Sequence, residues 1–108
     1  MLEVKAIVRP DRLHNVLHAV RDIAGVGGVT VSKVEGFGRQ RQVSGPAGEF
    51  GQVVMAKVET VIPREALAAV TTAITTAAAT GRPGDGKIFI LPVETVIDIR
   101  AAHTGSEP

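Results

Sequence analysis

The sequence predicts a small α+β domain, a ferredoxin-like βαββαβ sandwich with a long mobile loop, in which two helices cover one face of a sheet. Two observations support this fold class. Segments with the alternating pattern of strands flank two segments with helical spacing, in the order strand, helix, strand, loop, strand, helix, strand. The chain has 108 residues, a length that fits one domain, so we expect a single domain over residues 1–108.

The first half of the chain contains the first strand, the first helix and the second strand. Leu2–Val8 interleaves apolar and polar residues, which predicts a strand. Apolar residues at helical spacing then predict an amphipathic helix over Asp11–Ala24, with Pro10 at its start and three glycines after it. Val29–Val34 alternates again and predicts the second strand.

The second half repeats this pattern after a glycine-rich segment, 36–51, that is long for a loop in a compact domain. Loops of this kind usually carry function, so we expect a mobile functional loop over about 39–52. The remaining expected elements are a strand over Val53–Ile62, a helix over Glu65–Ala79, a glycine-rich loop over 80–87, strand-like runs over Ile88–Leu91 and Val96–Ile99, and a flexible tail over 101–108.

Composition excludes several classes of protein. The 12 Lys+Arg nearly balance the 11 Asp+Glu, and only three residues are aromatic, so a nucleic-acid-binding domain is not expected. The absence of Cys excludes disulfides and thiol chemistry. No apolar run approaches the ~20 residues of a membrane span, and a cytoplasmic protein is expected.

One face of the sheet lacks helices, and strands as apolar as VVMAKVETVI predict that another subunit covers it.

The loop TGRPGDGK (80–87) has the composition of an anion-binding loop. Glycines allow backbone N–H groups to approach phosphate oxygens, and Lys87 adds a positive charge. The alternative is a tight turn stabilised by glycine and aspartate, because the spacing is not that of a Walker A motif. Arg39 and Arg41 could clamp an anion beside it, or could belong to a solvated loop.

No catalytic site or metal site is predicted. His14 and His18 are one helical turn apart, and His103 lies near the end of the chain, but the expected helix presents the first two on its polar side. A zinc site needs three or four ligands, so surface histidines are the better interpretation. The serines lack a nucleophile-elbow context, and the protein is not expected to be an enzyme.

Three segments together carry a family resemblance: VTVSKVEGFGRQ (29–40), TGRPGDGKIF (80–89) and LPVETVIDIR (91–100). They resemble the PII nitrogen-regulatory signalling family, as does the opening VKAIVRPDRLHNVLHAV (4–20). The resemblance covers about residues 2–100 and is most specific in TGRPGDGKIF. It implies a homotrimer that binds an adenine nucleotide (ADP, AMP or ATP) in each cleft between subunits. A mobile loop beside the cleft would contact a target protein such as a transporter or metabolic enzyme.

The resemblance also implies which residues bind the nucleotide. They are Thr30, Val31, Gly36, Phe37, Gly38 and Arg39 of one subunit's second strand and loop base, Glu59 and Val61 of the third strand, Gly84, Asp85, Gly86 and Lys87 of the phosphate loop, and Arg100 from a neighbouring subunit. Gln40 and Arg41 are the expected contacts for an effector or small anion. Whether Mg²⁺ accompanies the nucleotide is left open.

Three departures from the family pattern change the expected function. The chain has no Tyr, which excludes the family's tyrosine modification and leaves Ser44 as a phosphorylation candidate, although a loop serine is usually only a turn former. Met55 stands where the family has a lysine for 2-oxoglutarate, and loss of a charge-assisted bond costs about 1.5–3 kcal/mol. Asp98 stands in place of a family arginine and, if it faces the cleft rather than solvent, disfavours a third phosphate.

With these departures, the chain resembles divergent PII-like proteins, some of which are associated with inorganic-carbon uptake or carboxysomes. The expected function is therefore a regulatory protein that binds ADP, AMP or ATP, with a small anion such as bicarbonate, and acts on its target through the mobile loop. Two alternatives stay open. One is a nitrogen-status sensor that binds ATP and 2-oxoglutarate, and the other is a trimeric structural or metal-responsive protein.

Overall fold

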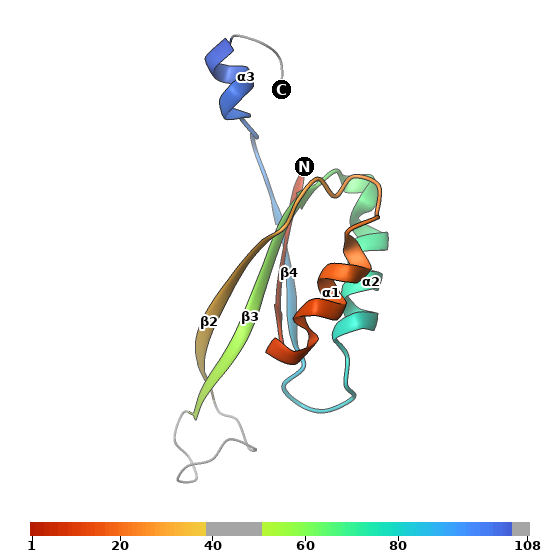
Figure 1. The fold of residues 1–108 in the computed structure, drawn as a ribbon, viewed down its shortest axis with the longest axis vertical. Helices are drawn as coiled ribbons and strands as arrows, with labels where there is room; N and C mark the ends of the chain where they lie inside the picture. The colour runs from red at the N-terminus through yellow and green to blue at the C-terminus, as the bar shows by residue number, and fades with distance from the viewer. Residues whose placement is uncertain (39–50, 105–108) are drawn as a thin grey trace.

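The computed structural model describes residues 1–38 and 51–104, which form one four-stranded sheet with two helices packed on one face (Figure 1). The elements in chain order are β1 (Leu2–Val8), the 3-10 helix η1 (Pro10–Arg12), α1 (Leu13–Val20), β2 (Thr30–Gly38), β3 (Gly51–Ile62), the 3-10 helix η2 (Arg64–Ala66), α2 (Leu67–Ala78), β4 (Gly86–Pro92) and α3 (Ile99–Thr104).

The strand order is that of the predicted ferredoxin-like fold, which is confirmed. The sheet runs β2-β3-β1-β4, and every neighbouring pair is antiparallel. β1 and β2 are therefore parallel with β3 between them, and β3 and β4 are parallel with β1 between them. Each helix makes the crossover within one such split βαβ unit.

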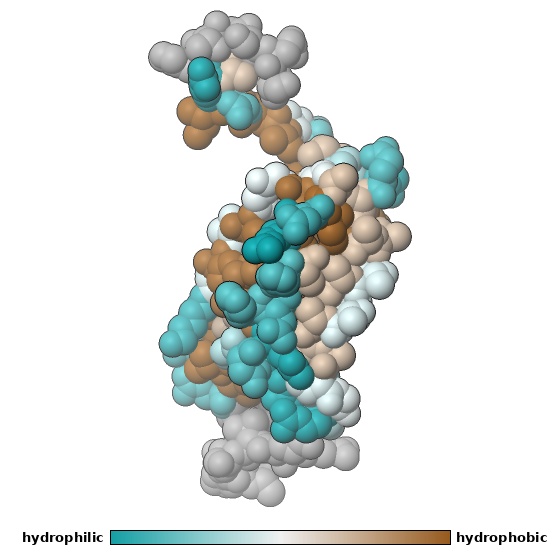
Figure 2. All heavy atoms as spheres, turned by 45° about the vertical axis from the view of Figure 1, so that its right-hand side comes forward, coloured by the Kyte–Doolittle hydropathy of each residue, from teal (hydrophilic) through white to brown (hydrophobic). Residues whose placement is uncertain are grey.

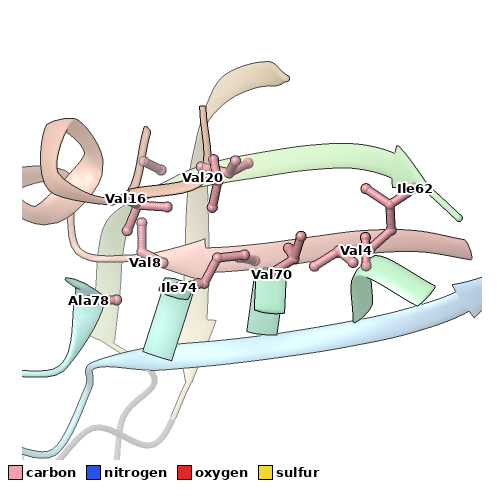
Figure 3. Packing of buried hydrophobic residues seen from close by; sticks show 12 residues of the cluster. Val4, Val8, Val16, Val20, Ile62, Val70, Ile74 and Ala78 are labelled. Carbon is pink, nitrogen blue, oxygen red and sulfur yellow. The ribbon is translucent and has the colours of Figure 1, made fainter. Parts of the chain in front are cut away.

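The core lies between the sheet and the two helices. Alternation along β1 turns Val4, Ala6 and Val8 toward the helices, and each is at most 2% exposed. Figure 3 shows these strand side chains meeting the buried residues of α1 and α2, among them Val16 and Ile74. α2 is rich in alanine and threonine, so it is held by this packing more than by its own helix propensity.

The first predicted helix ends earlier than the sequence pattern indicates. α1 stops at Val20, and the chain continues through turns in which Ile23 N–H donates to the Val20 carbonyl. Apolar spacing persists beyond the helix because Ile23 still packs against the core from these turns. Gly25, at φ +98°, then turns the chain away.

β2 ends four residues later than predicted. The segment Gly36–Gly38 belongs to the strand, because it pairs in register with residues 51–53 of β3. Glycines weaken a strand taken alone, but a ladder partner overrides that preference. Of the predicted mobile loop 39–52, residues 51 and 52 belong to β3, and residues 39–50, which include Arg39, Gln40, Arg41 and Ser44, lie outside the described residues.

The C-terminal segment also differs from the prediction. The run Val96–Ile99 forms no strand, and α3 begins at Ile99 and occupies the first part of the expected tail. A carboxylate oxygen of Asp98 accepts a hydrogen bond from Ala101 N–H at 3.0 Å, which is the usual N-cap interaction. In Figure 1, α3 stands apart from the sheet and the other helices.

Two surfaces of the molecule stay open. The sheet face opposite the helices carries Glu3, Lys5 and Ile7 of β1 at intermediate exposure. The segment leading to α3 carries exposed apolar side chains, with Ile97 69% and Ile99 87% exposed, and Figure 2 shows them gathered there. Within the described part of the chain, no helix is long and apolar enough to cross a membrane.

Candidate functional site

A cleft of about 1190 Å³ opens at the end of the sheet where β1 finishes and β3 begins. One side is the glycine-rich loop between α2 and β4, and the other is formed by the end of β2 and the start of β3. Phe37, Val54 and Phe89 give the cleft an apolar lining, and Arg82 and Lys87 bring positive charge. Concave sites with an apolar lining and a few polar groups are the usual form of ligand sites.

The glycines of this loop have specific geometric roles. Gly84 and Gly86 have φ values of +89° and +109°, a region that side chains other than glycine rarely adopt. Gly86 also passes so close to β1 that a Cβ there would lie 1.8 Å from the Ile7 carbonyl oxygen. The loop therefore rests directly on the end of β1, and no other residue can replace glycine at position 86 without moving the backbone.

Asp85 organises the inside of the loop. Its Oδ2 accepts hydrogen bonds from the backbone N–H groups of Thr80 at 2.7 Å and Gly81 at 3.1 Å, and its Oδ1 accepts one from the Thr80 hydroxyl. Arg9 donates from Nε to Oδ1 at 2.9 Å and from Nη2 to the carbonyl of Pro83 at 2.6 Å. The carboxylate thus faces into its own loop and onto β1, and is not directed at a ligand.

These contacts set the charges of the cleft. Hydrogen bonds from Thr80, and then from Arg9, hold the pKa of the Asp85 carboxyl well below its usual range, so it is ionised at neutral pH. Asp85 in turn neutralises Arg9. Within residues 1–38 and 51–104, Arg82 and Lys87 make no ion pair and remain available to an anion.

The structure brings together six of the residues that the resemblance assigns to a nucleotide. Gly36 and Phe37 of β2 line the same cleft as the four residues of the phosphate loop, which are Gly84, Asp85, Gly86 and Lys87. Gly38, next along β2, pairs with Gly51. The Lys87 ammonium and the loop backbone have the composition expected of a phosphate site, whereas the Asp85 side chain is occupied by structural hydrogen bonds.

A second group of predicted residues lies at the other end of the sheet. Thr30 pairs with Glu59, and six positions along β2 separate this pair from Gly36 and its partner Val53. At the rise of a strand this is about 20 Å. Val61 lies on the same face as Glu59, whereas alternation directs Val31 to the opposite face. Within one chain this second group thus lies apart from the cleft, and its assignment to the nucleotide stays a prediction.

Charged groups gather at this far end. Lys57 and Glu59 on β3 form an ion pair at 3.7 Å, and each side chain is less than one third exposed. A hydrogen bond with Glu59, together with partial burial and the charge of Glu59, raises the pKa of the Glu3 carboxyl above its ordinary value. This face holds two neighbouring carboxylates, and Lys5 and Lys57 offset part of their charge.

Arg100 and Asp98 lie away from the cleft of their own chain. Arg100 is in the first turn of α3, which stands apart from the sheet (Figure 1). The Asp98 carboxylate caps α3 by accepting a hydrogen bond from Ala101 N–H. It therefore does not face the cleft of its own chain. A charge pattern could not reveal this role, although an aspartate three residues before the donating N–H is a helix-start signal.

Several cleft residues were not predicted. Arg9 is the most consequential, and its contact with Asp85 joins positions 76 residues apart in the sequence. Ile7, Arg82 and Phe89 also line the cleft, as does Met55, which the sequence singled out only as a missing lysine. The signal that could have found Arg9 is its position at the end of a central strand, where an exposed polar residue often serves a site.

The described residues contain no group of three or more histidine, cysteine, aspartate or glutamate side chains that could hold a metal ion. His14 and His18 are both exposed on α1. The structure therefore offers no support for the metal-responsive alternative.

Comparison with known proteins agrees with the fold and the phosphate loop. A family model described as "Nitrogen regulatory protein P-II" matches residues 1–103. A nitrogen regulatory protein P-II of Rhizobium meliloti (strain 1021) is 41% identical over 109 residues, covering 97% of this chain and 96% of that protein. One from Nostoc punctiforme is 45% identical over 113 residues, covering 99% and 98%. A P-II homolog of Arabidopsis thaliana is 42% identical over 110 residues, covering 97% of this chain and 56% of that longer protein.

Proposed function

This chain belongs to the nitrogen regulatory protein P-II family, and from that premise we propose that it senses adenine nucleotides at clefts between the subunits of a homotrimer. Membership makes it a regulatory signalling protein and not an enzyme, as the sequence predicted. The proposal concerns what the signal is and how it reaches a target.

The observation that carries the proposal is the cleft beside the phosphate loop. Three glycines of that loop have positive φ, and Lys87 lies beside them with no acidic partner among the described residues. Backbone N–H groups together with one ammonium are a common way of binding phosphate oxygens. The apolar lining from Phe37 and Phe89 suits the less polar part of such a ligand.

The separation of the two groups of predicted residues supports the proposed assembly of several subunits. Thr30, Glu59 and Val61 cannot contact a ligand of their own cleft, which is about 20 Å away along the sheet. The same residues on a second subunit can complete the cleft. The open sheet face and the apolar segment before α3 are the surfaces available for this assembly.

Among nucleotides, ADP and AMP are expected to compete well with ATP. Asp98 adds negative charge where the family pattern has a guanidinium, and its use as a helix cap removes it from phosphate binding altogether. In either case the third phosphate lacks a partner. A small anion such as bicarbonate is proposed to bind to Arg41 and Gln40, and no role is assigned to Mg²⁺.

The output of the sensor is proposed to be the loop 39–52, which continues directly from the cleft residues of β2 and leads into β3. A bound nucleotide can bias this loop only by its difference in affinity for two loop states. The loop would then dock on, or release, a transporter or metabolic enzyme.

Isothermal titration with ADP, AMP, ATP, bicarbonate and 2-oxoglutarate tests the proposal. We expect binding of ADP and AMP at micromolar to submillimolar concentration, and no cooperation between ATP and 2-oxoglutarate. Failure of every adenine nucleotide to bind at millimolar concentration would refute the proposal.

A second function, that of a nitrogen-status sensor binding ATP and 2-oxoglutarate, is favoured by the names of the relatives. Against it stands Met55, whose thioether lines the cleft where a 2-oxoglutarate carboxylate would need a cation. Synergy between Mg-ATP and 2-oxoglutarate in the titration would establish this second function instead.

A further inference from the structure

The phosphate loop is attached to the end of β1 at two points, and one of them is an ion pair. Gly86 packs against the Ile7 carbonyl, and Asp85 is bound by Arg9, the residue that directly follows β1. The first contact is set by backbone geometry. The second depends on two side chains whose roles neither composition nor loop spacing reveals.

We propose that Arg9 is a positioning residue that holds the loop 80–87 in its ligand-binding shape through Asp85. This inference rests on the proposed function for its binding readout. Arg9 binds the loop by a fork, with Nε on the Asp85 carboxylate and Nη2 on the Pro83 carbonyl. A planar guanidinium can satisfy both acceptors at once, which an ammonium cannot.

The Asp85 carboxylate, held by Arg9, also binds the opposite side of the loop. Its oxygens accept from the N–H groups of Thr80 and Gly81, at the point where α2 has ended. The start and the end of the loop are therefore joined through one side chain, and Arg9 fixes that side chain to the sheet. Both side chains of the ion pair are only 25% exposed, so the contact is partly shielded from solvent.

Arg9 is assigned to positioning and not to direct phosphate binding because of where its donors point. Two of its guanidinium nitrogens are already engaged by the loop, and its charge is neutralised by Asp85. Lys87 and Arg82, which make no ion pair in the described segments, are left for the ligand. Arg9 thus stabilises the loop, whereas Arg82 and Lys87 are available to bind an anion.

Substitution of Asp85 distinguishes the two roles. If Arg9 bound phosphate directly, Asp85→Asn would remove a competing negative charge, release the guanidinium and strengthen ADP binding. If Arg9 acts through Asp85, the same substitution breaks the clamp and weakens binding, even though it removes negative charge beside a polyphosphate.

The experiment is titration of ADP into the wild-type protein and the variants Arg9→Gln, Arg9→Lys, Asp85→Asn and the double variant. We expect Arg9→Gln and Asp85→Asn each to weaken ADP binding about tenfold, because each removes a charge-assisted contact of the same clamp. The double variant should be no weaker than the worse single variant within about threefold, since both changes break one unit. Arg9→Lys should lie between wild type and Arg9→Gln.

Arg21→Gln is the matched control, because it removes the same charge from an exposed arginine that follows α1, outside both groups of proposed binding residues. We expect wild-type ADP affinity for it. Unchanged or tighter ADP binding by Asp85→Asn would overturn the positioning role of Arg9.

Amide hydrogen exchange in the absence of nucleotide separates this inference from the proposed function. The N–H groups of Thr80 and Gly81 are bonded to Asp85, so Arg9→Gln should accelerate their exchange at least about fivefold while core amides of β1 stay protected. Wild-type exchange at both positions would overturn the clamp. Faster exchange in a protein that binds no ADP would support the clamp and refute nucleotide sensing.

Discussion

The two ends of the sheet differ in how completely one chain builds them. At the cleft end, Asp85 is enclosed by donors from its own chain, and its pKa is lowered. At the far end, Glu3 faces Glu59 on an open sheet surface, and its pKa is raised. The Asp85 carboxylate is bound by hydrogen-bond donors, whereas the Glu3 carboxylate has another carboxylate, that of Glu59, as a neighbour.

This difference shows which part of the site can be attributed to the single subunit. The loop 80–87 is held by contacts within its own chain, from Asp85 to Thr80, Gly81 and Arg9. The far group, with Thr30, Glu59 and Val61, does not line the cleft of its own chain. Its predicted role requires a partner subunit, and each prediction below changes one end while leaving the other intact.

The largest effect is expected at Gly86. Gly86→Ala places a Cβ against the Ile7 carbonyl at a φ of +109°, so it should lower the free energy of unfolding by about 3 kcal/mol and abolish ADP binding. Urea denaturation and ADP titration measure both effects. Gly27→Ala is the control, because it has open space and no positive φ, and its change should stay within about 0.5 kcal/mol. A fully stable Gly86→Ala protein would contradict the close approach of the loop to β1.

The next effect is confined to ligand binding. Lys87→Ala should weaken ADP binding about tenfold or more, with the melting temperature unchanged, because the exposed ammonium contributes little to the core. Lys33→Ala, at an exposed position in the middle of β2, should leave the dissociation constant as it is. Equal ADP affinity of the wild type and Lys87→Ala would remove Lys87 from the site.

A smaller gain of function is expected at Met55. Met55→Lys supplies a cation inside the cleft and should raise 2-oxoglutarate affinity about tenfold in the presence of ATP. Met55→Leu, a change of similar volume, should not raise it. If lysine has no effect, the effector selectivity of this protein is set by other residues.

The smallest effect is expected at the far end. Because the pKa of Glu3 is raised in the folded state, its contact with Glu59 stabilises the protein below the ordinary glutamate pKa and is lost as the pH rises through the folded value. Glu3→Gln keeps a donor without the charge, so it should raise the free energy of unfolding at pH 7 by less than about 1 kcal/mol and give no gain at pH 4. Urea denaturation at both pH values provides the measurement, and a loss of stability at pH 7 would contradict the like-charge contact.

Much of the fold was predictable because the apolar pattern is local. Alternation along Leu2–Val8 and the spacing of apolar residues in 65–79 respond directly to the sheet and the core, and both elements are found near their expected positions. The elements that differ depend on distant partners. β2 extends to Gly38 because β3 pairs with it, and Val96–Ile99 forms no strand because Asp98 starts a helix instead.

The candidate site was likewise predictable where it depends on local sequence and not where it depends on distant partners. The glycines of TGRPGDGK indicate either an anion-binding loop or a tight turn from local sequence alone, and Gly84 and Gly86 line the cleft. The role of Arg9 could not be predicted, because its partner Asp85 lies 76 residues away. Nor could local sequence show that Thr30 and Gly36, on one strand, serve opposite ends of the sheet.

The central claim is that a nucleotide site combines the cleft end of one subunit with the far end of another. Mixing Lys87→Ala and Glu59→Ala subunits under conditions that exchange subunits, followed by ADP titration, tests it most directly. Each variant alone should bind ADP weakly. A mixed trimer should regain one intact cleft, in which the Glu59→Ala subunit supplies Lys87 and the Lys87→Ala subunit supplies Glu59. That cleft should bind ADP with wild-type affinity. Mixed trimers that bind ADP no better than either variant alone would contradict the claim.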